Sequence, residues 1–153
     1  DVVLNRLNLF DKRVADIDIL QDDVYVDFDN MPEKLPLRMV GDGMRRYLHM
    51  VAASANPMNN VILIDEIDNG LHYSAYAKIW KAIFELAVAY NKQIFVTTHS
   101  KETLAYLHEM LEENTDYQQE LRLYTIEHTL KKGLQAYKLT YKGLKALVLV
   151  ILK

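Results

Sequence analysis

The sequence predicts an α/β fold in which parallel central strands are flanked by helices and antiparallel edge hairpins. Two short segments, Val61 to Ile64 and Gln93 to Thr97, have the pattern of strands covered on both faces. Between them, apolar residues at helical spacing predict a long helix from Ser74, as its N-cap, to about Tyr90. A strand, a helix and a second strand in this order favour a parallel pair with a right-handed crossover.

Composition limits the classes of protein that the chain can represent. The 153 residues suit one domain, 1–153, and half of them are apolar, which is enough for a packed core. The formal charge of -3 argues against binding nucleic acid by bulk charge but leaves a local patch open. The chain has no cysteine, which excludes disulfides and thiolate metal sites and is compatible with a cytoplasmic protein. It opens with Asp1 and ends in the apolar run 147–152, so we expect a fragment of a larger protein.

The remaining elements flank this central strand pair. They are expected to be a helix over 1–13, a hairpin over 14–28, a loop over 30–36, helices over 43–56 and 101–114, a hairpin over 121–141 and a helix over 142–153. We divide the chain into strands and loop (1–36), a core that carries the candidate site (37–114), and an edge hairpin with a final helix (115–153). On the helix 43–56, Arg45 and Arg46 are expected to face solvent rather than a nucleotide.

Polar residues follow both central strands. Asp65 and Glu66 come directly after the first strand, and His99 follows the second. The carboxyl ends of parallel strands meet at one edge of a sheet, where α/β folds place ligands. There an acid pair can hold Mg²⁺ through oxygen and orient a water. The alternative is that both acids are ordinary solvated loop residues.

A second candidate site precedes the helix 43–56. Gly41, Asp42 and Gly43 stand at its start, where small residues let the backbone approach an anion and exposed N–H groups favour phosphate. The alternative is a plain aspartate N-cap between flexible neighbours.

Taken together and in order, three landmarks resemble the C-terminal half of an ABC-type ATPase. They are Gly41-Asp42-Gly43, then Val61-Ile62-Leu63-Ile64-Asp65-Glu66 with Asn69-Gly70-Leu71-His72, then Phe95-Val96-Thr97-Thr98-His99-Ser100. The likeness is to the soluble, non-transporter branch: RecF-like, SMC-like (chromosome-maintenance) and abortive-infection ATPases with an "AAA domain". It covers residues 35–105 and implies a partial P-loop NTPase layer that binds ATP and Mg²⁺.

The resemblance implies a role for each matching residue. Asp65 looks like the Walker B aspartate that binds Mg²⁺, and Glu66 like the catalytic glutamate that polarises the attacking water. His99 looks like the switch histidine beside the γ-phosphate. Residues 69–72, with Asn69, Gly70 and His72, look like the D-loop, and Gly41, Asp42 and Gly43 like a degenerate signature motif. In the family, these last two segments lie at a dimer interface around nucleotide.

This chain departs from the family pattern at three points. A glycine occupies the usual serine position of the signature, and His72 stands where aspartate is common. The chain contains no Gly-x-x-x-x-Gly-Lys-Ser/Thr, the loop that cradles the phosphates. We therefore expect the catalytic-glutamate half of an ATPase whose N-terminal, phosphate-binding half is its missing partner. The parent protein is expected to form a homodimer or to bind another partner through its nucleotide interface. It is expected to act in DNA maintenance or phage defence; nucleic acid stays open as a further partner, and no membrane partner is expected.

Two other functions remain open from the residues alone. Asp65, Glu66 and Asp68 with His99 could serve a Mg²⁺-dependent nuclease or phosphohydrolase, because three acids in four positions are suited to a metal. Alternatively, the chain is a non-catalytic interaction module that pairs through its exposed sheet edge.

Overall fold

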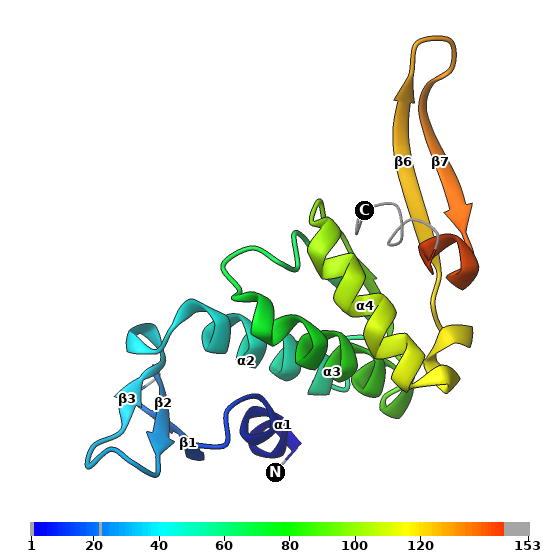
Figure 1. Cartoon of the computed structure of the whole chain (residues 1–153). Helices are drawn as coiled ribbons and strands as arrows, with labels where there is room; N and C mark the ends of the chain where they lie inside the picture. The colour runs from blue at the N-terminus through cyan, green and yellow to red at the C-terminus, as the bar shows by residue number, and fades with distance from the viewer. Residues whose placement is uncertain (1, 22, 146–153) are drawn as a thin grey trace. The chain divides into compact units, whose positions relative to one another are not determined.

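The computed structural model of the chain describes residues 2–21 and 23–145 (Figure 1). The chain divides into two compact units, residues 1–99 and 100–153, and each is considered by itself. Helices and a parallel strand pair stand beside antiparallel strands, which confirms the predicted α/β class. No helix among the described residues is both long enough and apolar enough to cross a membrane.

The first unit begins with a helix followed by an antiparallel sheet. Helix α1 (Val2–Phe10) leads into β1 (Val14–Leu20), β2 (Asp23–Phe28) and the short β3 (Leu35–Pro36), which pair in the order β1-β2-β3. The predicted hairpin over 14–28 is therefore confirmed, and β3 adds an edge strand where we expected only a loop.

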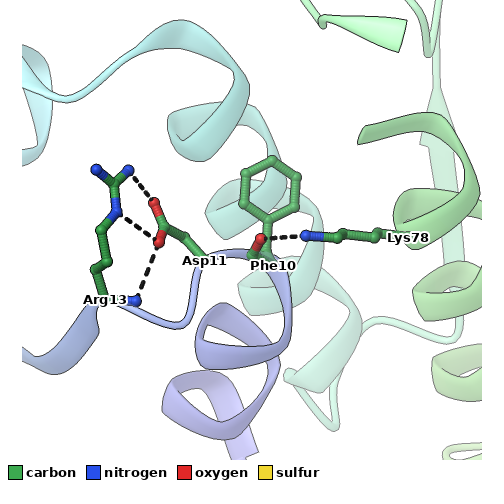
Figure 2. A network of polar contacts seen from close by, with 4 residues as sticks. All are labelled: Phe10, Asp11, Arg13 and Lys78. Carbon is green, nitrogen blue, oxygen red and sulfur yellow. Dashed lines mark hydrogen bonds and ion pairs between the residues drawn. The ribbon is translucent and has the colours of Figure 1, made fainter. Parts of the chain in front are cut away.

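Polar contacts fix the chain where α1 ends (Figure 2). The Lys78 ammonium donates to the carbonyl of Phe10 at 2.8 Å and lies 5.8 Å from the centre of the Phe10 ring. A cation is favourable at this C-terminal end of a helix. Just beyond the helix, Arg13 binds the Asp11 carboxylate through its backbone N–H and its guanidinium. Since Lys78 belongs to the helix α3 (Tyr76–Ala89), its contact with Phe10 joins α1 to that helix.

The centre of the first unit is a parallel pair of strands with two helices packed against it. The elements are η1 (Leu37–Met39), α2 (Asp42–Ala55), β4 (Val61–Ile64), η2 (Tyr73–Ala75), α3 (Tyr76–Ala89) and β5 (Gln93–Val96). Strand β4 pairs with β5 in parallel, from Val61 beside Gln93 to Ile64 beside Val96. The buried core between the helices includes Tyr47, Val51, Ile79 and Leu86.

The two strands are covered on one face only, so the prediction that both faces are buried is wrong for this chain. Ile62 and Ile64 are buried, whereas Val61, Leu63 and Phe95 are 52%, 77% and 58% exposed. Helices α2 and α3 contact the strands β4 and β5. An unbroken apolar run indicates that both faces of a strand are apolar. It does not indicate whether residues of the same chain pack against both faces.

The start of α3 also differs from the prediction. Ser74 does not cap the helix, because it lies within η2, and the Nδ1 of His72 accepts the Ser74 N–H at 3.4 Å. Of the apolar residues at helical spacing that predicted this helix, five are buried: Tyr76, Ile79, Trp80, Ile83 and Phe84. Tyr90 is 36% exposed because the helix ends one residue before it.

The second unit is a helix and a hairpin. Helix α4 (Lys101–Glu113) begins at Ser100, whose side chain accepts the N–H of Thr103 at 3.2 Å, as an N-cap should. After η3 (Thr115–Gln119), β6 (Leu123–Thr129) pairs antiparallel with β7 (Gly133–Leu139). Residues 141–145 are helical, and the rest of the predicted helix 142–153 lies outside the described residues.

Two contacts anchor the base of this hairpin to α4. The Tyr141 ring stacks on His108 with centroids 5.4 Å apart, and the Lys145 ammonium lies 3.0 Å from the Glu112 carboxylate. The Lys145 ammonium lowers the pKa of Glu112 through this hydrogen bond. The hairpin itself stays exposed, with Ile126 66% and Leu134 68% accessible to solvent.

Candidate active site at the carboxyl edge of the strand pair

The parallel register brings the ends of β4 and β5 side by side. The N–H of Thr97 donates to the carbonyl of Ile64 at 2.9 Å, and the N–H of Ile67 donates to the carbonyl of Thr97 at 3.1 Å. These bonds continue the ladder beyond both strands, so the segment that carries Asp65 and Glu66 lies against Thr97. The side chains of these two acids and of Thr97 are all exposed. The edge is therefore open to a ligand from solvent.

The hydroxyl of Thr97 joins the two acidic residues. Its Oγ1 accepts the backbone N–H of Glu66 at 2.9 Å and donates to Oδ1 of Asp65. A hydroxyl has one proton to give, so both partners are held in one arrangement. The Oδ2 of Asp65 is not part of this contact. One carboxylate oxygen thus remains for a cation.

The backbone of Glu66 is left-handed, with φ of 46°. Such a conformation costs a residue other than glycine about 1–2 kcal/mol and persists where surrounding contacts hold it. Here the Glu66 carbonyl accepts the Asn69 N–H at 3.0 Å, and Asn69 Nδ2 lies 3.4 Å from Glu66 Oε2. The residue is therefore bound at both its N–H and its carbonyl, and its exposed carboxylate accepts a hydrogen bond from the Asn69 amide.

A guanidinium from α2 supports the same loop. Arg46 Nη2 lies 3.0 Å from the carbonyl oxygen of Glu66 and 3.4 Å from that of Asp65. Arg46 is half-buried, and its side chain reaches across to the loop after β4, which the expectation of a solvent-facing residue did not include. Arg45 instead forms a surface ion pair with Asp42 at 2.6 Å.

Asp68 is held apart from the acid pair. Its Oδ1 accepts a hydrogen bond from the hydroxyl of Thr98, the next residue along from Thr97. Among residues 2–21 and 23–145, no three histidine, aspartate or glutamate side chains converge as ligands for one metal ion. The nuclease hypothesis, which needs Asp65, Glu66 and Asp68 to share a metal, therefore has no support in this geometry.

The start of α2 packs against the turn after the acids. A β-carbon placed on Gly70 would lie 3.9 Å from Asp42 Cβ, and one on Gly43 would lie 3.5 Å from Leu71 Cδ2. Gly41 is the N-cap and Asp42 the first helical residue, so the alternative of an aspartate N-cap is wrong. The signature-like and D-loop-like segments are thus neighbours. A β-carbon placed on Gly41 would meet no described atom within 4 Å, so this position is open to solvent.

The two candidate histidines differ in their surroundings. His72 is tied to its own turn, because its Nδ1 lies 2.9 Å from the Ser74 hydroxyl and its ring lies against that of Tyr73. His99 is exposed and stands two residues beyond Thr97 at the carboxyl edge. Of the two histidines, His99 is therefore the one whose backbone follows a strand of the parallel pair.

Sequence reasoning missed two residues of this site, Thr97 and Arg46. Thr97 lies within the third landmark, but a threonine at the end of a strand is common, so nothing assigned it a role until the register was known. Arg46 lies two residues from the buried Met44 and Leu48, and residues two apart on a helix do not share a face, so the helical pattern marks it only as a surface position. Its contact with the loop after β4 depends on how α2 packs.

The arrangement suits a magnesium ion held by one carboxylate. Mg²⁺ in proteins commonly takes one or two carboxylates together with phosphate and water oxygens. Asp65 offers one exposed carboxylate whose other oxygen is engaged by Thr97. Glu66 stands beside it as an exposed acid that can accept a proton. The donor set thus fits a nucleotide-bound Mg²⁺ better than an ion caged by protein ligands alone.

Comparison with known proteins agrees with this fold. A chain from a structural study titled "Structural biochemistry of ATP-driven dimerization and DNA stimulated activation of SMC ATPases" has the same fold. It matches with a TM-score of 0.62 and 13% identity over 99% of this chain and 92% of that one. An "ATP/GTP phosphatase" of Helicobacter pylori is 32% identical over 126 residues, 79% of this chain and 34% of the relative. The chain thus spans about a third of that relative's length.

The fold and these comparisons define an ATPase-type α/β domain with an SMC-like architecture. Residues 5–105 match the family described as "AAA domain, putative AbiEii toxin, Type IV TA system". The chain belongs to this family of AAA-domain proteins.

Proposed function

We propose that this chain is the catalytic-glutamate half of an ATP-hydrolysing domain. The observation that carries the proposal is the Asp65-Glu66-Thr97 cluster at the carboxyl edge of two parallel strands. An α/β fold places its ligand at this edge, and the cluster supplies one metal-binding carboxylate and one general base. The name of the Helicobacter pylori relative supports the choice of a nucleoside triphosphate as substrate.

Each residue has one role in this proposal. Asp65 binds Mg²⁺, directly or through water, and the ion neutralises charge on the triphosphate when bound. Glu66 orients the attacking water by accepting a hydrogen bond from it. His99 donates a hydrogen bond to the γ-phosphate from the end of the neighbouring strand. All three come from exposed positions at one edge, so one triphosphate can meet them together.

The start of α2 serves a second nucleotide in this proposal. The first N–H groups of a helix attract phosphate, and Gly41 leaves the backbone accessible there. Asp42 is paired with Arg45 at 2.6 Å, so its carboxylate is partly neutralised. Gly43 and Gly70 lie where the start of α2 packs against the turn at Asn69, Gly70 and His72. That turn would therefore meet the same surface of a partner as the start of α2. Two copies facing each other would then enclose nucleotide, which agrees with the ATP-driven dimerization named for the SMC structure.

The phosphate-binding loop must come from another segment. The sequence has none, while β4 and β5 expose the apolar residues Val61, Leu63 and Phe95 on one face. An exposed apolar sheet face is a surface for further structure. We infer that the phosphate-binding half of the domain covers it. This chain alone then hydrolyses little ATP, and the parent protein uses the cycle in DNA maintenance or phage defence.

The proposal is tested by ATP hydrolysis in the polypeptide as the cell makes it, with any flanking sequence. We expect hydrolysis that requires Mg²⁺, and an Asp65→Asn variant that needs at least about tenfold more Mg²⁺ for half-maximal rate. Asp116→Asn is the matched control, because Asp116 is an exposed acid on η3 in the second unit. Equal Mg²⁺ requirements in wild type and Asp65→Asn would contradict the assigned role of Asp65.

A further inference from the structure

We infer that Thr97 is a positioning residue that sets the geometry of the acid pair through its hydroxyl. The inference rests on the proposed function for its effect on catalysis, but its structural part can be measured without nucleotide. Thr97 lies within the landmark 95–100, two residues before His99, but the family resemblance gives it no role. Its Oγ1 is the one side-chain atom bonded to both the Glu66 N–H and the Asp65 carboxylate among the described residues.

The direction of these two hydrogen bonds determines what Thr97 does. The Glu66 N–H can only donate, so the hydroxyl oxygen accepts from it, and the hydroxyl proton is left for Asp65 Oδ1. This proton engages one oxygen of Asp65 and leaves Oδ2 to face a cation. The same hydroxyl therefore selects which carboxylate oxygen binds metal and fixes the backbone of the residue that carries the base.

The hydrogen bond from the Glu66 N–H to Thr97 also helps to hold Glu66 in a backbone conformation that glutamate disfavours. A left-handed φ of 46° is unfavourable for glutamate, so the loop needs bonds on both sides of the residue to keep it. Arg46 and the Asn69 N–H bind the Glu66 carbonyl, and Thr97 binds its N–H. Removing the Thr97 hydroxyl takes away the partner of the Glu66 N–H, so the Glu66 carboxylate loses its fixed direction.

Three substitutions separate this role from a merely structural one. Thr97→Val keeps the shape and the β-branch but removes the hydroxyl. Thr97→Ser restores the hydroxyl on a smaller side chain. Thr98→Val is the matched control, because it removes the neighbouring hydroxyl, which donates to Asp68 rather than to the acid pair. Thr97 is exposed, so neither change at this position opens a cavity in the core.

The first measurement is amide hydrogen exchange of Glu66 in the 153-residue chain, without nucleotide. We expect exchange about tenfold faster in Thr97→Val and near wild type in Thr97→Ser, since one hydrogen bond protects this N–H. Thr98→Val should leave it unchanged. Equal Glu66 exchange in wild type and Thr97→Val would overturn the inference, whatever the chain's activity.

The second measurement is ATP hydrolysis in the polypeptide as the cell makes it. We expect Thr97→Val to lower kcat by about 10–100-fold and to raise the Mg²⁺ requirement, with KM for ATP little changed and Thr97→Ser restoring the rate. Glu66→Gln distinguishes a failure of the role of Thr97 from a failure of the proposed function. If Glu66→Gln is inactive but Thr97→Val is fully active, only the role of Thr97 fails. If Glu66→Gln is fully active, the proposed function fails.

Discussion

The guanidinium of Arg46 lies 3.0 Å from the carbonyl oxygen of Glu66, although twenty residues separate them in the sequence. Arg46 belongs to the helix that starts with Gly41, Asp42 and Gly43, so one side chain links that helix to the loop of the acid pair. The bond engages the carbonyl of a residue held in a left-handed conformation. The position of the candidate base is thus set partly by α2 and not only by β4.

Replacing Arg46 with alanine should destabilise the first unit. We expect a loss of about 1–2 kcal/mol in the free energy of unfolding, because a charged donor to two carbonyls is removed. Arg45→Ala is the matched control on the same helix, and its surface ion pair should be worth under about 0.5 kcal/mol. Urea denaturation of both variants measures the difference. Equal losses would show that the bond from Arg46 to the loop contributes nothing.

Two glycines in contacting segments should respond to alanine in opposite directions. Gly70 has φ of 71°, so Gly70→Ala should cost about 1 kcal/mol in backbone strain, although its β-carbon would have room at 3.9 Å. Gly43 lies in the first turn of α2, and Gly43→Ala should be neutral or stabilise by up to about 1 kcal/mol. Thermal denaturation of the two variants checks the signs. A stabilised Gly70→Ala would contradict the left-handed turn.

The buried ammonium of Lys92 binds the loop that connects α2 to β4. Its Nζ lies 2.5 Å from the carbonyl of Asn56 and 2.7 Å from that of Asn59, and the residue is 8% exposed. Lys92→Met should destabilise the fold by about 2–3 kcal/mol, because two carbonyls lose a charged donor. Lys81→Met, at an exposed position of α3, is the control and should change stability little. The two denaturation midpoints should differ clearly, and equal midpoints would refute the role of Lys92 in holding this loop.

Tyr47 should make the first unit sensitive to alkali. Burial raises the pKa of Tyr47 to about 12, from 10.0 in the unfolded chain. The folded state therefore favours the protonated phenol, and this contribution is complete below pH 10 and is lost as the pH rises towards 12. The free energy of unfolding of wild type, compared with that of Tyr47→Phe, should therefore fall as the pH rises through that range. Urea titrations at about pH 9, 10 and 11 measure it, and a constant difference would contradict the burial of the phenol.

Local patterns predicted most of the elements. The alternation in residues 14–28 predicted the β1–β2 hairpin, and the apolar stripe of α3 follows the periodicity of its sequence. The exposure of one face of β4 and β5 was not predictable from the sequence. An apolar run has the same pattern whether or not residues of this chain pack against its second face. Ser74 failed as a cap because His72, two residues earlier, begins a separate 3₁₀ turn.

The candidate site was predictable only in part, for a related physical reason. Asp65, Glu66 and His99 could be placed at one edge because each follows a strand and the strands were expected to be parallel. Thr97 and Arg46 depend on register and on helix packing, which a single sequence does not reveal. The left-handed backbone of Glu66 is likewise a product of contacts with distant residues, since glutamate has no preference for that conformation.

The most direct test of the central claim is ATP turnover by a Glu66→Gln variant in the polypeptide as the cell makes it. Glutamine keeps the size and the amide contact with Asn69 but cannot accept a proton from the attacking water. Single-turnover hydrolysis is measured beside binding of a fluorescent ATP analogue. The account predicts that turnover falls at least about a hundredfold while the nucleotide affinity stays within about twofold of wild type. Turnover equal to that of wild type would contradict it.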